Sequence, residues 1–176
     1  MSINSTPKDL VALDLLKRTA EGQRASFQKL YQLTNRQVYT YLNRFLCNKN
    51  ATDEVLAATY LEVWRSAKRY QGSYRVCIWI LLIARAKAKR KLKQLMADEK
   101  QNPAINPGNL DKQKLLIWAM SNLQPHHREL LGLALMPEFT YHEIAKLMNI
   151  QVNTAKIRVF SAKDALLQSL VQLEDD

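Results

Sequence analysis

The chain of 176 residues contains 26 Lys and Arg against 16 Asp and Glu, and therefore carries a net charge of +10 at pH 7. This excess of positive charge indicates a polyanionic partner, which nucleic acid or an anionic membrane surface could supply. Hydrophobic residues make up 47% of the chain, with only 4 Gly and 5 Pro, a composition that excludes a disordered or fibrous protein. Because turn residues are few, we expect long helices and an all-α fold.

The sequence gives no sign of a membrane segment or of a bound cofactor. No stretch approaches the roughly 20 apolar residues that cross a bilayer, and the amino-terminal residues MSINSTPKDL lack the design of a secretion signal. We expect no membrane insertion and a cytoplasmic location. Cys47 and Cys77 lie in apolar helical sequence, where free cysteine usually acts as a small buried hydrophobe, so we expect neither a disulfide nor a metal site.

Helical periodicity runs through residues 9–96. Breaks at residues 21–22, 48–50 and 71–73 divide this half and predict four helices. The third helix is expected to begin at a Thr52 cap, with acidic residues near the positive end of the helix dipole. The second is expected to turn one apolar stripe toward a core, formed by Phe27, Leu30, Tyr31, Val38, Tyr41, Leu42 and Phe45.

A strongly basic segment, with ten basic and no acidic residues, lies between Arg65 and Lys93. Tyr70, Tyr74 and Trp79 are interleaved with these cations, and aromatic rings stack on unpaired bases while cations follow a nucleic-acid backbone. Such a segment predicts binding to single-stranded nucleic acid. The inward side of its helix is expected to be Leu81, Ala84, Ala88, Leu92 and Leu95.

The same residues also have a purely structural interpretation. Large aromatic side chains mostly supply buried area, which favours a core or half-core position for Trp64 and Trp79. Tyr70 and Tyr74, beside the break at Gly72, are the better stacking candidates. A basic helix could also lie on an anionic membrane, but its alanine-rich opposite face favours packing against protein.

Residues 98–109 contain two prolines, a glycine and mostly polar residues, and are predicted to form a linker. The chain is therefore expected to form two helical domains, residues 1–97 and residues 110–176. Each domain would carry its own apolar stripes.

The second domain contains the pattern of a helix-turn-helix. Thr140 and Glu143 form a capping box at the start of one helix, and Asn149 can adopt the left-handed conformation at its end. From about Val152 a second helix has an apolar stripe on one side and polar or basic residues on the others. Such a helix reads base edges in the major groove, although an ordinary helical hairpin with a polar face would give the same pattern.

The histidines argue against an enzyme with a metal or acid–base site. His126 and His127 are adjacent, so they point apart on a helix, and His142 lies in the turn of the capping box. No paired carboxylates complete a ligand or catalytic set. We therefore expect no catalytic residues, and a nuclease or hydrolase is the least favoured reading.

Both halves resemble the extracytoplasmic-function (ECF) sigma factors of the sigma-70 family. The run TDEVLAATYLEVW at residues 52–64 resembles the polymerase-binding helix of sigma region 2, and YQGSYRVCIWILLIAR at residues 70–85 resembles its promoter-melting segment. LQPHHRELL at residues 123–131, TYHEIA at 140–145 and NTAK at 153–156 resemble sigma region 4. These matches follow the family's order along nearly the whole chain. Ala57 departs from the pattern, because a glutamine is common there.

The resemblance implies a sigma factor that binds core RNA polymerase through its beta and beta-prime subunits and directs it to promoter DNA, with an anti-sigma factor as a further partner. Core polymerase would be bound by Asp53, Glu54, Ala57, Tyr60, Leu61 and Trp64. The minus-ten element would be bound by Lys68, Arg69, Tyr70, Tyr74, Arg75, Trp79, Arg85, Lys87 and Arg90. The minus-35 element would be read by Thr140, Tyr141, Asn153, Thr154, Lys156, Ile157, Arg158 and Ser161. The alternative is a stand-alone helix-turn-helix regulator that acts without polymerase.

Overall fold

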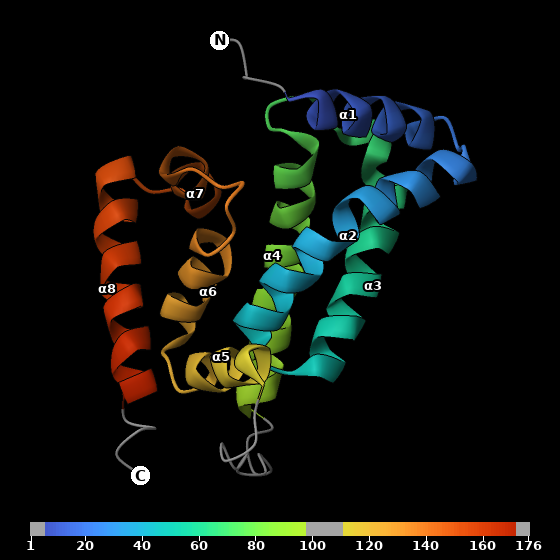
Figure 1. Ribbon diagram of the computed structural model, residues 1–176. Coiled ribbons are helices and arrows are strands. Elements are labelled where there is room, and N and C mark those ends of the chain that lie inside the picture. The colour runs from blue at the N-terminus through green and yellow to red at the C-terminus, as the bar shows by residue number, and fades with distance from the viewer. Residues whose placement is uncertain (1–5, 98–110, 172–176) are drawn as a thin grey trace.

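The computed structural model describes residues 6–97 and 111–171, and within these ranges the helices are joined by short turns and loops, with no β-strand (Figure 1). The first range contains α1 (Pro7–Ala20), α2 (Arg24–Leu46), α3 (Lys49–Ser66), the short 3-10 helix η1 (Ala67–Arg69) and α4 (Val76–Ala97). The second contains α5 (Lys112–Ser121), α6 (Pro125–Ala134), α7 (Tyr141–Met148) and α8 (Val152–Val171). The predicted all-α fold is confirmed. No helix in these ranges is long and apolar enough to cross a membrane.

Helices α2, α3 and α4 form a bundle, and α1 lies across one end of it (Figure 1). Aromatic residues join α2 to α3: the ring of Tyr60 packs edge-on to that of Tyr31, with centroids 4.7 Å apart. The Tyr60 hydroxyl shares a 2.7 Å hydrogen bond with the hydroxyl of Thr34. Thr34 also donates to the carbonyl of Leu30, so the buried polar atoms of this contact are satisfied. In the predicted inward stripe of α4, Leu81, Ala84, Ala88 and Leu92 are buried and Leu95 is half-buried.

The start of α3 differs from the expectation. Asn48, and not Thr52, is the cap: its side-chain oxygen accepts a 2.9 Å hydrogen bond from the Ala51 amide. Cys47 precedes it in the left-handed conformation, with φ of 50°, and thereby ends α2. Because an asparagine is available four residues earlier, the helix begins earlier, and Thr52 is buried inside it.

The helix-turn-helix pattern is confirmed in detail. Thr140 accepts from the Glu143 amide at 3.3 Å while the Glu143 carboxylate accepts from the Thr140 amide at 3.0 Å. Asn149 ends α7 with φ of 54°, and its amide donates back to the carbonyls of the last turn. On the apolar stripe of α8, Ala155, Val159, Ala162 and Leu166 are buried.

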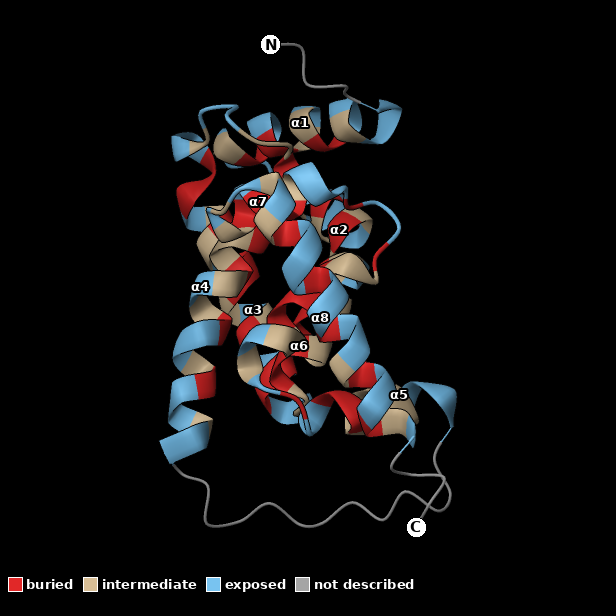
Figure 2. Ribbon diagram, turned by 90° about the vertical axis from the view of Figure 1, so that its left-hand side faces the viewer, coloured by how far each residue is buried: buried red, intermediate tan, exposed pale blue. Residues whose placement is uncertain are grey.

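The two halves pack directly against each other. α6 lies against α2, α5 contacts both α2 and α8, and α7 contacts α4. The buried apolar residues of both halves form one continuous cluster, whereas the outer face of α8 is exposed (Figure 2). The predicted linker, residues 98–109, lies outside the described residues. The division into two domains stays a prediction.

We predict that Asn149→Ala lowers the free energy of unfolding by about 1 kcal/mol, because alanine is strained at a positive φ, a conformation that asparagine tolerates better. Asn149→Gly is the matched control and should be nearly neutral, since glycine adopts this conformation without strain. Urea denaturation of the full chain measures both. Equal stability of the two variants would mean that backbone strain at this turn does not matter.

Candidate polymerase and nucleic-acid interfaces

One face of α3 is open to solvent. Asp53, Glu54, Ala57 and Leu61 are exposed on it, and residues 53, 57 and 61 fall on the same side because they are four apart. Leu61 keeps 50% of its surface exposed and supplies the apolar side chain of this face. Lys91 of α4 pairs with Glu54 at the edge of this face. The arrangement combines an apolar centre with acidic neighbours, as a protein-binding surface does.

Two other residues of the predicted polymerase-binding set lie inward. Tyr60 is buried, and this burial raises the pKa of its hydroxyl. Trp64 is half-buried and packs edge-on to Phe27, with ring centroids 5.2 Å apart. Both side chains therefore stabilise the junction of α2 and α3. The exposed members of the predicted polymerase-binding set are therefore Asp53, Glu54, Ala57 and Leu61.

The basic residues predicted to hold the minus-ten strand fall into two groups. Four are exposed or half-exposed and make no ion pair with any described residue: Lys68, Arg69, Lys87 and Arg90. The other two, Arg75 and Arg85, are largely buried and form ion pairs with carboxylates of the second half. Only the first group is therefore free to meet phosphates in this arrangement.

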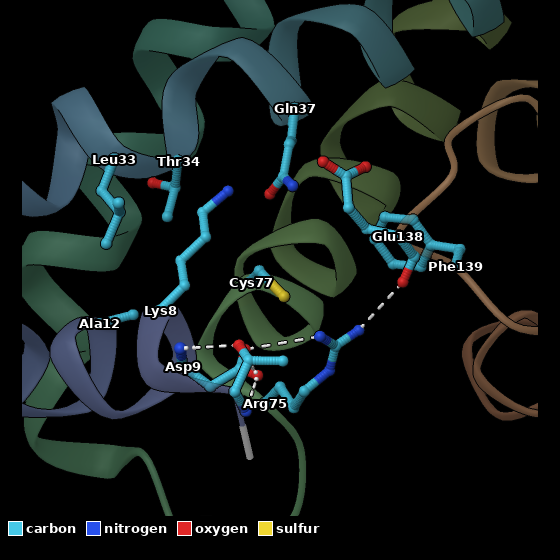
Figure 3. A pocket seen from close by; sticks show the side chains of 11 residues that line it. Lys8, Asp9, Ala12, Leu33, Thr34, Gln37, Arg75, Cys77, Glu138 and Phe139 are labelled. Atoms are coloured by element: carbon cyan, nitrogen blue, oxygen red, sulfur yellow. Dashed lines mark hydrogen bonds and ion pairs between the residues drawn. The ribbon is translucent and has the colours of Figure 1, made fainter. Parts of the chain in front are cut away.

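Arg75 lies where α1, the start of α4 and the second half meet, beside a cavity of about 280 Å³ (Figure 3). Its guanidinium pairs with Glu143, lies 3.5 Å from the Asp9 carboxylate and donates to the Glu138 carbonyl at 3.4 Å. Partial burial alone would raise the pKa of Asp9, but hydrogen bonds from Thr6 and the charge of Arg75 together lower it. The side chain of Arg75 is only 14% exposed.

The predicted stacking residues are also engaged. The Tyr70 hydroxyl donates to the Tyr74 carbonyl, and the Tyr70 ring packs edge-on to Trp79 with centroids 5.4 Å apart. The ammonium group of Lys146, on α7, lies 4.3 Å from the centre of the Tyr74 ring and donates to the Ser73 carbonyl at 2.9 Å. A helix of the second half therefore covers one face of Tyr74.

A buried carboxylate joins α6 to α4. Glu129 has only 6% of its side chain exposed, and its Oε1 lies 2.6 Å from Arg85 Nε and 3.6 Å from Lys89 Nζ. Sequence reasoning missed Glu129, because a glutamate in an amphipathic helix is normally expected at the surface. Its partners Arg85 and Lys89 are 44 and 40 residues away along the chain, so no local pattern identifies them.

The outer face of α8 and the start of α7 carry the residues predicted to read the minus-35 element. Thr154 is half-buried, and the others are exposed: Thr140, Tyr141, Asn153, Lys156, Ile157, Arg158 and Ser161. Phe160 was not predicted, yet it is 76% exposed, one turn after the 70% exposed Ile157. A large aromatic residue outside the buried stripe was the available signal. Two exposed apolar side chains among cations suit contact with thymine methyl groups.

Comparison with known proteins identifies related sequences. A family model described as sigma-70 region 2 matches residues 30–97. The RNA polymerase sigma factor CarQ of Myxococcus xanthus is 27% identical over 169 residues, which cover 90% of this chain and 97% of CarQ. The ECF RNA polymerase sigma factor SigK of Mycobacterium ulcerans is 25% identical, with 86% of this chain and 88% of SigK covered.

Two solved structures have the same fold. CnrH, in complex with the cytosolic domain of CnrY, superposes with a TM-score of 0.73 at 16% identity and covers 94% of this chain and 99% of that chain. RpoE of Bartonella quintana, in complex with the anti-sigma factor NepR, superposes with a TM-score of 0.67 at 18% identity, over 82% of this chain and 96% of that chain. The region 2 match and the curated relatives bear out the predicted resemblance: over most of its length the chain is similar to RNA polymerase sigma factors of the ECF group.

Proposed function

We propose that the exposed face of α3 docks on the beta-prime subunit of core RNA polymerase, in the cytoplasm, and that the protein acts by binding and not by catalysis. The observation that supports this assignment is the combination of an exposed Leu61 with Asp53, Glu54 and Ala57 on one side of a helix. Exposed apolar surface rimmed by polar residues marks protein-binding sites. The beta subunit would contact the second half.

The basic surface of η1 and α4 is proposed to hold the non-template strand at the minus-ten element. Lys68, Arg69, Lys87 and Arg90 would follow the phosphates, while Tyr70 and Tyr74 would stack on bases. A base inside a duplex cannot stack on a side chain, so binding a base only when it is unpaired converts binding energy into strand separation.

The recognition helix α8 is proposed to enter the major groove of the minus-35 element. Lys156 and Arg158 would donate to guanine edges, Asn153 would read adenine, and Ile157 with Phe160 would contact thymine methyl groups. An anti-sigma factor is the further partner that we propose, since one of the similar structures, RpoE of Bartonella quintana, was solved with one.

The alternative, a helix-turn-helix regulator that works without polymerase, accounts for α7 and α8 but gives no role to the α3 face. The deciding experiment is to mix the purified chain with core polymerase and map transcription starts on genomic DNA. Defined starts that require the chain support the proposed function. Duplex binding without any start would favour the regulator.

We predict that Ala57→Gln strengthens core binding about fivefold, because an added amide can make one hydrogen bond to polar groups of the partner, which contributes roughly 1 kcal/mol. Ala57 is exposed, so the larger side chain is accommodated without disturbing the bundle. Fluorescence titration of labelled protein with core polymerase measures the affinity. Ala86→Gln, on the exposed side of α4, is the control and should leave it unchanged. Weaker or unchanged affinity for Ala57→Gln would mean that this protein has rebuilt its polymerase interface around Ala57.

A second prediction separates base reading from phosphate contact. In holoenzyme, Lys156→Ala or Arg158→Ala should reduce the preference for the native minus-35 sequence over a mismatched one by about 1 to 3 kcal/mol. Lys87→Ala or Arg90→Ala should weaken binding to every sequence and reduce the salt dependence by about one unit of slope for each lost contact. Binding curves at several salt concentrations give both quantities. The opposite pattern would reverse the two assignments.

A further inference from the structure

A cavity beside the recognition helix has no part in the proposed function so far. It has a volume of about 410 Å³ and lies between the first turns of α6, the end of α7 and the middle of α8. The residues that line it are His126, His127, Leu130, Met148, Arg158 and Ser161. His126, Arg158 and Ser161 are exposed, so the cavity can be reached from solvent.

The two histidines of this cavity lie together. The sequence predicts that adjacent residues point apart on a helix, and for this pair the prediction is wrong. The ring centroids of His126 and His127 are 4.1 Å apart, with the ring planes tilted by 58°. Burial and the neighbouring His126 lower the pKa of His127. Two charged imidazoles this close repel each other, so an anion beside them would stabilise the charged pair.

The surroundings of the pair are positively charged. No carboxylate lines the cavity, and Arg158 forms no ion pair with any described residue. On its other side His126 borders a second cavity, together with Lys89 and Lys93 of α4 and with Glu129. The Glu129 carboxylate is already paired with α4, and α7 contributes only an uncharged methionine. The described residues therefore leave the positive charge of this site without a counter-charge.

The start of α6 adds to this excess of positive charge. A helix N-terminus is the positive end of the helix dipole, and acidic side chains normally stabilise it. Asp9 does so in α1 and Glu143 in α7, but α6 has no acidic residue in its first turn. Two imidazoles of this turn share the cavity with a guanidinium and a hydroxyl of α8. Donors from two helices thus line one accessible space, as in a site for an oxyanion.

We propose that this cavity binds a backbone phosphate of duplex DNA at the edge of the major groove that α8 enters. The inference rests on the proposed role of α8 in that groove. An α-helix with its side chains is about as wide as the major groove, so groups beside the helix face the phosphates. Arg158, assigned above to a guanine edge, also lines the cavity, so the phosphate site adjoins the base-reading face. The phosphate accepts hydrogen bonds from Ser161 and the charged imidazoles, and it positions α8 without reading sequence.

Such a site couples DNA binding to the uptake of protons. In the free chain, burial and the nearby cations Arg158, Lys89 and Lys93 oppose protonation of the pair. A bound phosphate favours the charged imidazoles, so the pair takes up protons when DNA binds. The affinity for duplex DNA therefore rises as the pH falls from about 8 to about 6, through the range in which histidine titrates.

Nuclear magnetic resonance tests the site directly, because the full chain contains only three histidines. The imidazole proton resonances are titrated with pH in the free chain and with a short DNA duplex of arbitrary sequence. We expect His126 and His127 to titrate about one pH unit higher when the duplex is bound. His142, which is exposed on α7 and does not line the cavity, is the internal reference and should not shift.

Binding measurements with variants give a second readout. By fluorescence anisotropy, the wild-type chain should bind the duplex about fivefold more tightly at about pH 6 than at about pH 8. The double variant His126→Gln, His127→Gln should lose most of this gain, because glutamine cannot be protonated. His142→Gln is the matched control and should keep the gain. Circular dichroism confirms that helix content is retained.

The outcomes separate failure of the site from failure of the proposed function. Equal shifts at all three histidines, or a pH gain that persists in the double variant, would overturn the phosphate site. Full shifts with inorganic phosphate, and none beyond them with duplex, would overturn the assignment to DNA. Duplex binding without any histidine shift would overturn the site and leave the role of α8 standing. A chain that binds no duplex at either pH would instead overturn the proposed role of α8, and with it the site.

Discussion

The ion pair between Glu129 and Arg85 is the contact on which the arrangement of the two halves depends. A buried carboxylate is costly unless it is paired, and the pairing ties α6, which packs against α2, to α4. In this arrangement Gly132 faces Tyr41 and α7 reaches the start of α4, where Glu143 meets Arg75. The helix-turn-helix is thereby oriented with the outer face of α8 toward solvent (Figure 2).

Local features of the chain were predictable because their causes are local. The capping box at Thr140, the left-handed Asn149 and the buried stripe of α8 each follow from residues within one or two turns. Periodicity also placed the helices of the first half, apart from the start of α3. There two candidate caps compete, and the choice of Asn48 over Thr52 depends on how α2 ends at Cys47.

Long-range features could not be read from the sequence. The family resemblance placed Tyr60 in a binding helix, but its inward direction depends on Thr34 and Tyr31 of another helix. Likewise Glu129 and Gly132 look unremarkable along the chain, because the residues that explain them lie on α4 and α2. The sequence thus predicted which basic and aromatic residues are candidates for binding. The structure determines which of them are accessible.

Asp9 connects the amino-terminal helix to this boundary. Its carboxylate accepts from the Thr6 amide, which closes the capping box of α1, and it also approaches Arg75. One side chain therefore serves both the first turn of α1 and the junction with the second half. Fraying of that turn would withdraw a negative charge from Arg75, so motion at one end of the first half is coupled to how firmly the other half is held. Alterations in the first turn of α1 would thus act on the contact between the two halves without touching the buried apolar cluster.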